Sequence, residues 1–290
     1  LDAQYWVKDW DPALYATLYR EPVNPRPRAY AEIFKKWDDY TIGFITYSEG
    51  MNDDVNKFIW SSLGWDPQLE VDTILTEYAR YFIHPKWKVS FAQGLLALEQ
   101  NWKGPLLMNI GVYETLRIFQ DMEAKATPRD KLNWRFQSAL YRAYYDAYIR
   151  RRLIHETEIE EKNMDMLRRA DQLGSILALN SAEDILNRTV IDIVAPDWRR
   201  RVYELAEALF QSRRMQLDVN KYAASDKRRG GNLEDIDEPV NNYQELKKEF
   251  SRIRSLSGES ERRQAIKAIT CQRYQMKKEF DDRVIQEGIN

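Results

Sequence analysis

Apolar side chains recur at the spacing of an α-helix along most of the chain beyond residue 53. In the most regular stretch, Ile74, Tyr78 and Phe82 would share one face of a helix. Ser181 and Asp184 approximate a capping box, so we expect one helix to begin there. Periodicity and end signals together predict helices over residues 53–63, 71–83, 89–101, 110–125, 129–179 with an interruption, 182–193, 197–222, 242–256 and 259–285.

The segment before residue 53 follows a different pattern. Residues 1–27 hold four prolines and no helical period, which predicts an irregular segment, and residues 28–37 form a short amphipathic helix. Residues 40–47 are rich in Thr, Ile, Phe and Tyr, which predicts a strand. Apolar residues occur at both odd and even positions, so both faces of this strand are expected to be buried. Since a lone strand is unstable, it must pair within residues 1–30 or with chain not present here.

These patterns predict a mainly α fold: a helical bundle domain preceded by the last strand or strands of a partial (β/α) barrel. The expected division is a barrel-like part at 1–66, a helical domain at 67–224, and a polar loop with two peripheral helices at 225–290. Residues 225–239 combine Gly230-Gly231 with charged residues and few apolar ones. We expect this loop to be the most mobile interior segment.

Composition and charge narrow the possible chemistry. Lys+Arg is 44 and Asp+Glu is 46, a net of −2, which gives no reason to expect nucleic acid as a partner. No apolar run approaches the ~20 residues of a membrane span. Cys271 is the one cysteine, and neither His84 nor His155 has Glu three residues before it. The sequence therefore predicts no metal site and no cofactor. The chain opens without Met, so we expect it to begin inside a longer polypeptide.

Large aromatic residues are expected to form much of the helical core. Eight of the nine Trp lie between Trp6 and Trp134, and four tyrosines at helical spacing lie within residues 141–148. Buried aromatic side chains contribute strongly to a core because of their large apolar surface. The residues expected to be largely buried are Trp102, Phe119, Trp134, Leu140, Tyr141 and Tyr145.

One constellation suggests a ligand site. Glu49 follows the predicted strand directly and precedes a helix, a position where α/β folds build their sites. Asp53 lies four residues on, and Tyr47 and Trp60 are near in sequence. Carboxylates accept hydrogen bonds from sugar hydroxyls, and aromatic faces cover sugar C–H groups. The alternative is that Glu49 fixes a turn and that Asp53 and Asp54 cap the helix.

Several sequence runs resemble large bacterial proteins that carry a glycoside-hydrolase-type barrel, similar to those of hexosaminidases and α-glucuronidases. In such proteins a Ser-Glu-Gly turn ends the last barrel strand and a helical domain follows. The resemblance covers about residues 1–220. The runs that carry it are Gly43–Trp60, Gly64–Pro67, Glu77–Phe82, Asn101–Leu107 and Leu140–Asp146.

The resemblance implies the C-terminal part of a glycoside hydrolase acting on a polysaccharide or glycan. Its partners would be a carbohydrate ligand and the upstream part of its own polypeptide, and its location periplasmic or extracellular. In such barrels the acid and base carboxylates come mainly from middle strands, which would precede residue 1. Glycoside hydrolysis needs two such carboxylates, so the chain alone is expected to be inactive. By this analogy Glu49, Tyr47, Trp60 and Asp53 bind substrate, while the catalytic residues stay unknown.

A second interpretation is a non-catalytic α-helical interaction or scaffold module. Its long helices and mixed charges would then serve a protein partner. The segment 40–47 separates the two interpretations. A paired strand with Glu49 facing a cavity favours the hydrolase, whereas a helix or an isolated edge favours the scaffold.

Overall fold

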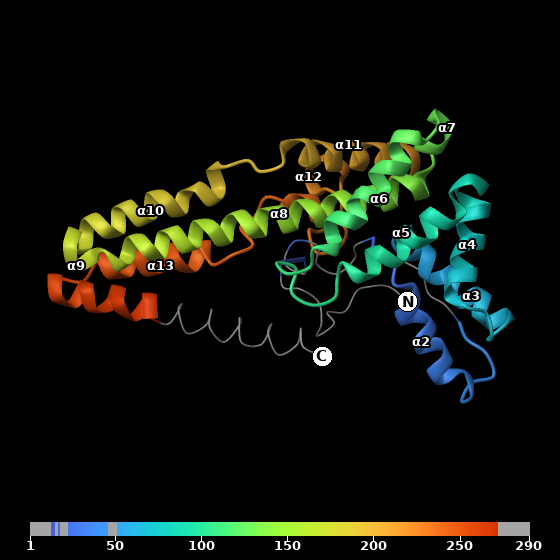
Figure 1. The fold of residues 1–290 in the computed structure, drawn as a ribbon, viewed down its shortest axis with the longest axis horizontal. Helices are drawn as coiled ribbons and strands as arrows, with labels where there is room; N and C mark the ends of the chain where they lie inside the picture. The colour runs from blue at the N-terminus through green and yellow to red at the C-terminus, as the bar shows by residue number, and fades with distance from the viewer. Residues whose placement is uncertain (1–12, 15–16, 18–22, 46–50, 272–290) are drawn as a thin grey trace. The chain divides into compact units, whose positions relative to one another are not determined.

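The computed structural model describes residues 13–14, 17, 23–45 and 51–271, and this part of the chain is mainly helical (Figure 1). The chain divides into two compact units. Unit 1 comprises residues 1–153 and 194–238, and unit 2 comprises residues 154–193 and 239–290. Both units are discontinuous in sequence, unlike the linear division expected above. None of the described helices combines the length and apolar composition needed to cross a membrane.

Unit 1 is built from consecutive helices that pack against their neighbours, followed by the first part of a long helix and by a later return of the chain (Figure 1). Its α-helices are α2 (Pro27–Asp38), α3 (Asp54–Trp65), α4 (Val71–Phe82), α5 (Lys88–Gln100), α6 (Gly111–Lys125), α7 (Pro128–Lys131), residues 134–153 of α8 (Trp134–Arg168), α11 (Pro196–Arg213) and α12 (Val219–Tyr222). Its short 3₁₀ helices are η1 (Met51–Asp53), η2 (Pro85–Trp87) and η3 (Asn232–Asp235).

Unit 2 is a set of helices around its own apolar core. Figure 1 shows α10 and α13 running beside the second half of α8. The unit contains residues 154–168 of α8, α9 (Ala170–Leu173), α10 (Ser175–Ile191), α13 (Tyr243–Arg254) and a last helix described over 259–271. Its buried core is formed by Met164, Leu167, Ala170, Ala178, Leu179, Ala182, Leu186, Leu246, Phe250, Ile253, Ile266 and Ile269.

Two predicted helix boundaries are wrong. Ser181 does not start a helix, because α10 runs unbroken from Ser175, with Ala178 and Ala182 buried on one face. The predicted helix 129–179 is interrupted at residues 132–133, at Arg169 and at Gly174, whose φ of 86° suits glycine better than other residues. The predicted helix 197–222 ends at Arg213, because Arg214 adopts a left-handed conformation with φ 57°.

The predicted strand does not form in its described part. Residues 40–45 make a turn and an irregular segment, and no strand occurs among the described residues. Tyr40, Ile42 and Ile45 are exposed, at 81%, 113% and 99%. A strand needs a neighbouring strand for its backbone hydrogen bonds, and the described chain supplies none to this segment. The predicted partial barrel at 1–66 is therefore not formed by the described residues, while residues 46 and 47 lie outside them.

The aromatic core of unit 1 is largely as predicted. Trp102, Phe119, Tyr141 and Tyr145 are buried, as is Leu140 beside them on α8. Phe119 packs edge-to-face on Phe91, with ring centroids 5.9 Å apart. Trp134 is the exception, because it is the first residue of α8 and stays partly exposed.

The polar loop at 225–239 is held to α8 by hydrogen bonds. Tyr141 donates to Asn232 Oδ1 over 2.7 Å, Tyr148 donates to Asp237 Oδ1 over 2.7 Å, and Arg152 donates to the Ile236 carbonyl over 2.6 Å. The loop itself buries Asn232, Leu233, Asp235 and Ile236. Composition predicted a solvated segment, but these anchors give its second half a buried, hydrogen-bonded structure. Its mobility stays a prediction.

Glu259 caps the start of α10 in unit 2 and should make this unit sensitive to acid. Its carboxylate accepts from the backbone and hydroxyl of Ser175 and from the Arg263 and Arg262 guanidiniums. The Ser175 hydroxyl and amide, and then Arg263, lower the pKa of Glu259 to about 2. The contribution of this carboxylate to the free energy of unfolding is therefore fully present above about pH 4.5. It is lost as the pH falls toward 2.

We expect Glu259→Gln to reduce the loss of stability that unit 2 shows as the pH is lowered. The measurement is the urea midpoint at a series of pH values between 2 and 7. Glu261→Gln, an exposed neighbour on the same helix, serves as the control. Equal pH dependence in the Glu259 variant and the parent would refute the capping role.

Candidate functional site

The residues singled out from the sequence do not gather at one described site. Glu49 and Tyr47 lie outside the described residues. Asp53 is buried, with its carboxylate Oδ1 3.6 Å from Lys57 Nζ. Trp60 packs edge-to-face within an aromatic cluster of α2, α3 and the segment between them. The binding roles of all four residues stay predictions.

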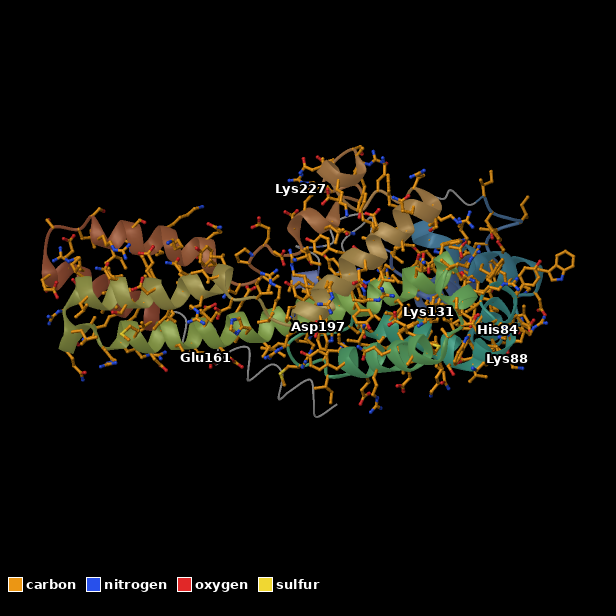
Figure 2. All side chains as sticks on the ribbon, turned by 90° about the horizontal axis from the view of Figure 1, so that it is seen from above. His84, Lys88, Lys131, Glu161, Asp197 and Lys227 are labelled. Carbon is orange, nitrogen blue, oxygen red and sulfur yellow. The ribbon has the colours of Figure 1, made fainter. Side chains whose placement is uncertain are left out.

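A groove of about 510 Å³ opens in unit 1, where the ends of several helices meet. We name it the α4–α8 groove. Figure 2 labels His84 in this groove, with Lys88 of α5 and Lys131 of α7 in the same part of unit 1. Its lining consists of residues 80–85, 129, 130 and 132–135, together with Arg213 at the end of α11.

The walls of the groove are tied together by side-chain hydrogen bonds. Asn133 donates to the carbonyl of Phe82 over 2.6 Å, which joins the end of α4 to the turn before α8. Trp87 donates through Nε1 to Asp130 over 3.4 Å, which joins η2 to α7. Asp130 also forms a reciprocal capping box with Thr127. These contacts set the spacing of the helix ends that line the groove.

Arg135 lies at the inner edge of the groove in a fixed orientation. Its Nε and Nη2 donate to the two oxygens of Asp54 over 2.8 and 3.1 Å. Its guanidinium carbon lies 4.1 Å from the ring centroid of Phe82 and 4.2 Å from that of Trp134. Tyr78 also donates to Asp54, over 2.7 Å. Burial raises the pKa of Tyr78 well above its usual value, so its hydroxyl stays protonated and donates.

A second, smaller cavity lies beside the same arginine. It is lined by Asp54, Tyr78, Trp134 and Arg135, and by Ser138 among mostly apolar neighbours. Its volume of about 30 Å³ suits one or two water molecules. A substrate therefore has room in the outer groove but not in this inner cavity.

The charge of the groove is one-sided. Arg80, Arg129, Arg135 and Arg213 line it, against the single carboxylate of Asp130. Arg80 pairs with Glu77 and Arg135 pairs with Asp54. Arg129 and Arg213 form no ion pair among the described residues, and the Arg213 guanidinium lies 5.5 Å from the Trp134 ring centroid. Two cationic groups thus line the groove without an acidic partner in the described part of the chain.

No family model, curated protein or solved structure matches this chain. The comparisons therefore neither support nor oppose the glycoside-hydrolase resemblance.

The described residues of the groove supply binding groups rather than a pair of carboxylates. Asp130 is already engaged by Thr127 and Trp87. Elsewhere in the described chain no group of three or more His, Cys, Asp or Glu side chains could hold a metal ion. The arrangement can stack on a ring face, accept and donate hydrogen bonds, and hold negative charge.

Sequence reasoning missed most of this groove. Trp134 was expected in the core and Asp54 in a helix cap, whereas the first lines the groove and the second orients Arg135. Arg129 and Arg213 are 84 positions apart, so no local pattern could join them. The available signal was the pair Trp134-Arg135 just after the Thr127-capped turn, where a helix begins with exposed aromatic and cationic groups.

Proposed function

We propose that this chain is the C-terminal part of a glycoside hydrolase acting on a polysaccharide or glycan. Its own contribution is to hold the saccharide in the α4–α8 groove. The observation that carries this proposal is the lining, which brings Trp134, Phe82 and Tyr81 into one groove with hydrogen-bonding groups. Aromatic faces beside polar side chains are suited to sugars, whose rings have apolar C–H patches and hydroxyl edges.

The size and position of the groove support the same proposal. Ligand sites commonly measure about 300–1,000 Å³, and the groove's 510 Å³ falls within that range. Met51 lines the inner cavity that shares Trp134 and Arg135 with the groove. Glu49 and Tyr47, the predicted substrate-binding residues, precede Met51 by two and four positions.

Two observations favour the alternative of a non-catalytic interaction or scaffold module. The described residues 40–45 do not form the paired strand that would favour the hydrolase. Large apolar side chains are exposed on and just after α10 in unit 2, where a protein partner could cover them. They are Ile176, Leu177, Val190, Ile191 and Ile193, with exposed fractions of 42–70%.

Calorimetric titration of the chain with a panel of neutral and charged oligosaccharides tests the proposal. At least one should bind, and Trp134→Ala should weaken its binding about tenfold or more, since a stacked ring is lost. The matched control is Trp65→Ala, because Trp65 is 92% exposed and does not line the groove. Circular dichroism verifies that both variants are folded. If no oligosaccharide binds, or if both variants weaken binding equally, the groove is not a saccharide site.

A further inference from the structure

We infer that the ligand of the α4–α8 groove carries an anionic substituent, and that Arg129 and Arg213 bind it. The saccharide part of this ligand rests on the proposed function, whereas the anionic part rests on the groove alone. Carboxylate, sulfate ester and phosphate ester groups present the same kind of oxygen acceptors to a guanidinium. Their shared chemistry is therefore what the groove recognises.

Several arginines of the described chain, among them Arg117 and Arg151, form no ion pair, but Arg129 and Arg213 are the two of this kind that line the groove. Elsewhere on α11, Arg199 pairs with Asp237 and Arg201 pairs with Glu123. Arg129 on α7 and Arg213 at the end of α11 have no such partner among the described residues, although they line one groove.

The basic character of the groove is not a by-product of composition. The whole chain has a formal net charge of −2, so an average surface hollow would not be basic. A concave surface lined by one sign of charge concentrates its field and attracts ligands of the opposite sign. Arg80 and Arg135 are neutralised by Glu77 and Asp54, so Arg129 and Arg213 set the charge of the groove against the carboxylate of Asp130 and favour an anion.

The start of α8 adds to this field. Asn133, Trp134 and Arg135 all line the groove, so the N-terminal end of this 35-residue helix lies at its surface. The first turn of α8 contains no acidic residue of its own, and the nearby Asp54 carboxylate is already neutralised by Arg135. Asn133 accepts from the backbone of Arg135 over 3.0 Å, which fixes the turn. The dipole and the two guanidiniums thus favour negative charge in the same place.

The test compares three oligosaccharides of equal length: a neutral one, one with a uronate carboxylate and one with a sulfate ester. Inorganic sulfate and inorganic phosphate are titrated alongside. Each probe is added to the full chain and to Arg129→Gln, Arg213→Gln and Arg200→Gln. The last variant is the control, because Arg200 pairs with Asp197 outside the groove and its loss changes the net charge equally.

We expect an anionic oligosaccharide to bind at least tenfold more tightly than the neutral one. Arg129→Gln and Arg213→Gln should each weaken that binding about ten- to a hundredfold, as expected for loss of a charge-assisted hydrogen bond. Arg200→Gln should leave the affinity unchanged. The oligosaccharide that binds most tightly identifies the anionic substituent. Preference for the uronate indicates a carboxylate, and preference for the sulfate ester indicates a sulfate or phosphate ester. Both groove arginines are exposed, so the variants should melt with the parent.

The remaining outcomes separate the two proposals. Equal binding of neutral and anionic oligosaccharides, unaffected by the arginine variants, overturns the anion inference and leaves the saccharide proposal standing. Arginine-dependent binding of inorganic sulfate or phosphate, with no oligosaccharide bound, supports the anion inference and overturns the saccharide proposal. Equal weakening by all three arginine variants shows a general charge effect and overturns the anion inference. Binding of no probe overturns both.

Discussion

Asp146→Ala should lower the free energy of unfolding of unit 1 by about 3–5 kcal/mol, because it leaves a buried arginine without its counter-ion. Arg142 and Asp146, one turn apart on α8, form an ion pair in which neither side chain is exposed to solvent. Asn101 donates to the second oxygen of Asp146 over 2.9 Å. Nε and Nη1 of Arg142 have no acceptor among the described residues, so the guanidinium depends on this carboxylate.

The measurement is thermal and urea unfolding of the parent and the variant, with a melting point shift on the order of 10 °C. Asp165→Ala on the same helix is the control, since Asp165 is 73% exposed and its pair with Arg168 should contribute under ~1 kcal/mol. A double replacement, Arg142→Met with Asp146→Leu, should cost less than Asp146→Ala alone. If Asp146→Ala and Asp165→Ala destabilise equally, the buried pair has no special role.

Phe250→Ala should remove about 3–5 kcal/mol of stability from unit 2, because it opens a cavity in the centre of that unit's core. Phe250 on α13 is fully buried in the apolar cluster, together with Leu167 of α8 and Leu179 of α10. Hydrogen exchange should quicken mainly in the helices of unit 2, since the lost contacts lie within it.

Ile253→Val, one turn further along α13, provides a graded comparison. Ile253 is also fully buried, but the change removes one methylene group and should cost about 0.5–1.5 kcal/mol. If Phe250→Ala costs no more than Ile253→Val, the site collapses around the cavity or the ring is not part of a packed core.

Helix periodicity predicted most elements because each helix buries one apolar face. The predicted and observed limits of α4 differ by one residue, and Tyr141 and Tyr145 were placed correctly in the core. Local signals failed where contacts from distant residues decide the structure. Ser181 resembles a cap, but the apolar stripe of α10 continues through Ala178 and Ala182, so the helix is not broken there.

The same limitation explains the groove and the polar loop. The loop around Asn232 looked solvated, because the tyrosine hydroxyls that bind it lie about 90 positions earlier. The groove joins helix ends whose sequences show no common motif. Arg129 and Arg213, which form no ion pair with the described residues, look like ordinary surface residues in the sequence. Residues 40–45 have strand-like composition, but strand formation depends on a partner that composition does not reveal.

The order of unit 1 along the chain has a consequence for synthesis on the ribosome. The hydroxyls of Tyr141 and Tyr145 meet Asn232 only after residues 154–193, which belong to unit 2, have been made. Domains usually fold as they emerge from the N-terminus, but unit 1 must wait for its last segment. At 5–20 residues per second, the interval between Tyr148 and Asp237 takes roughly 5–20 seconds. During that interval the hydroxyls of Tyr141 and Tyr148 lack the later-made acceptors that they bind in the folded unit.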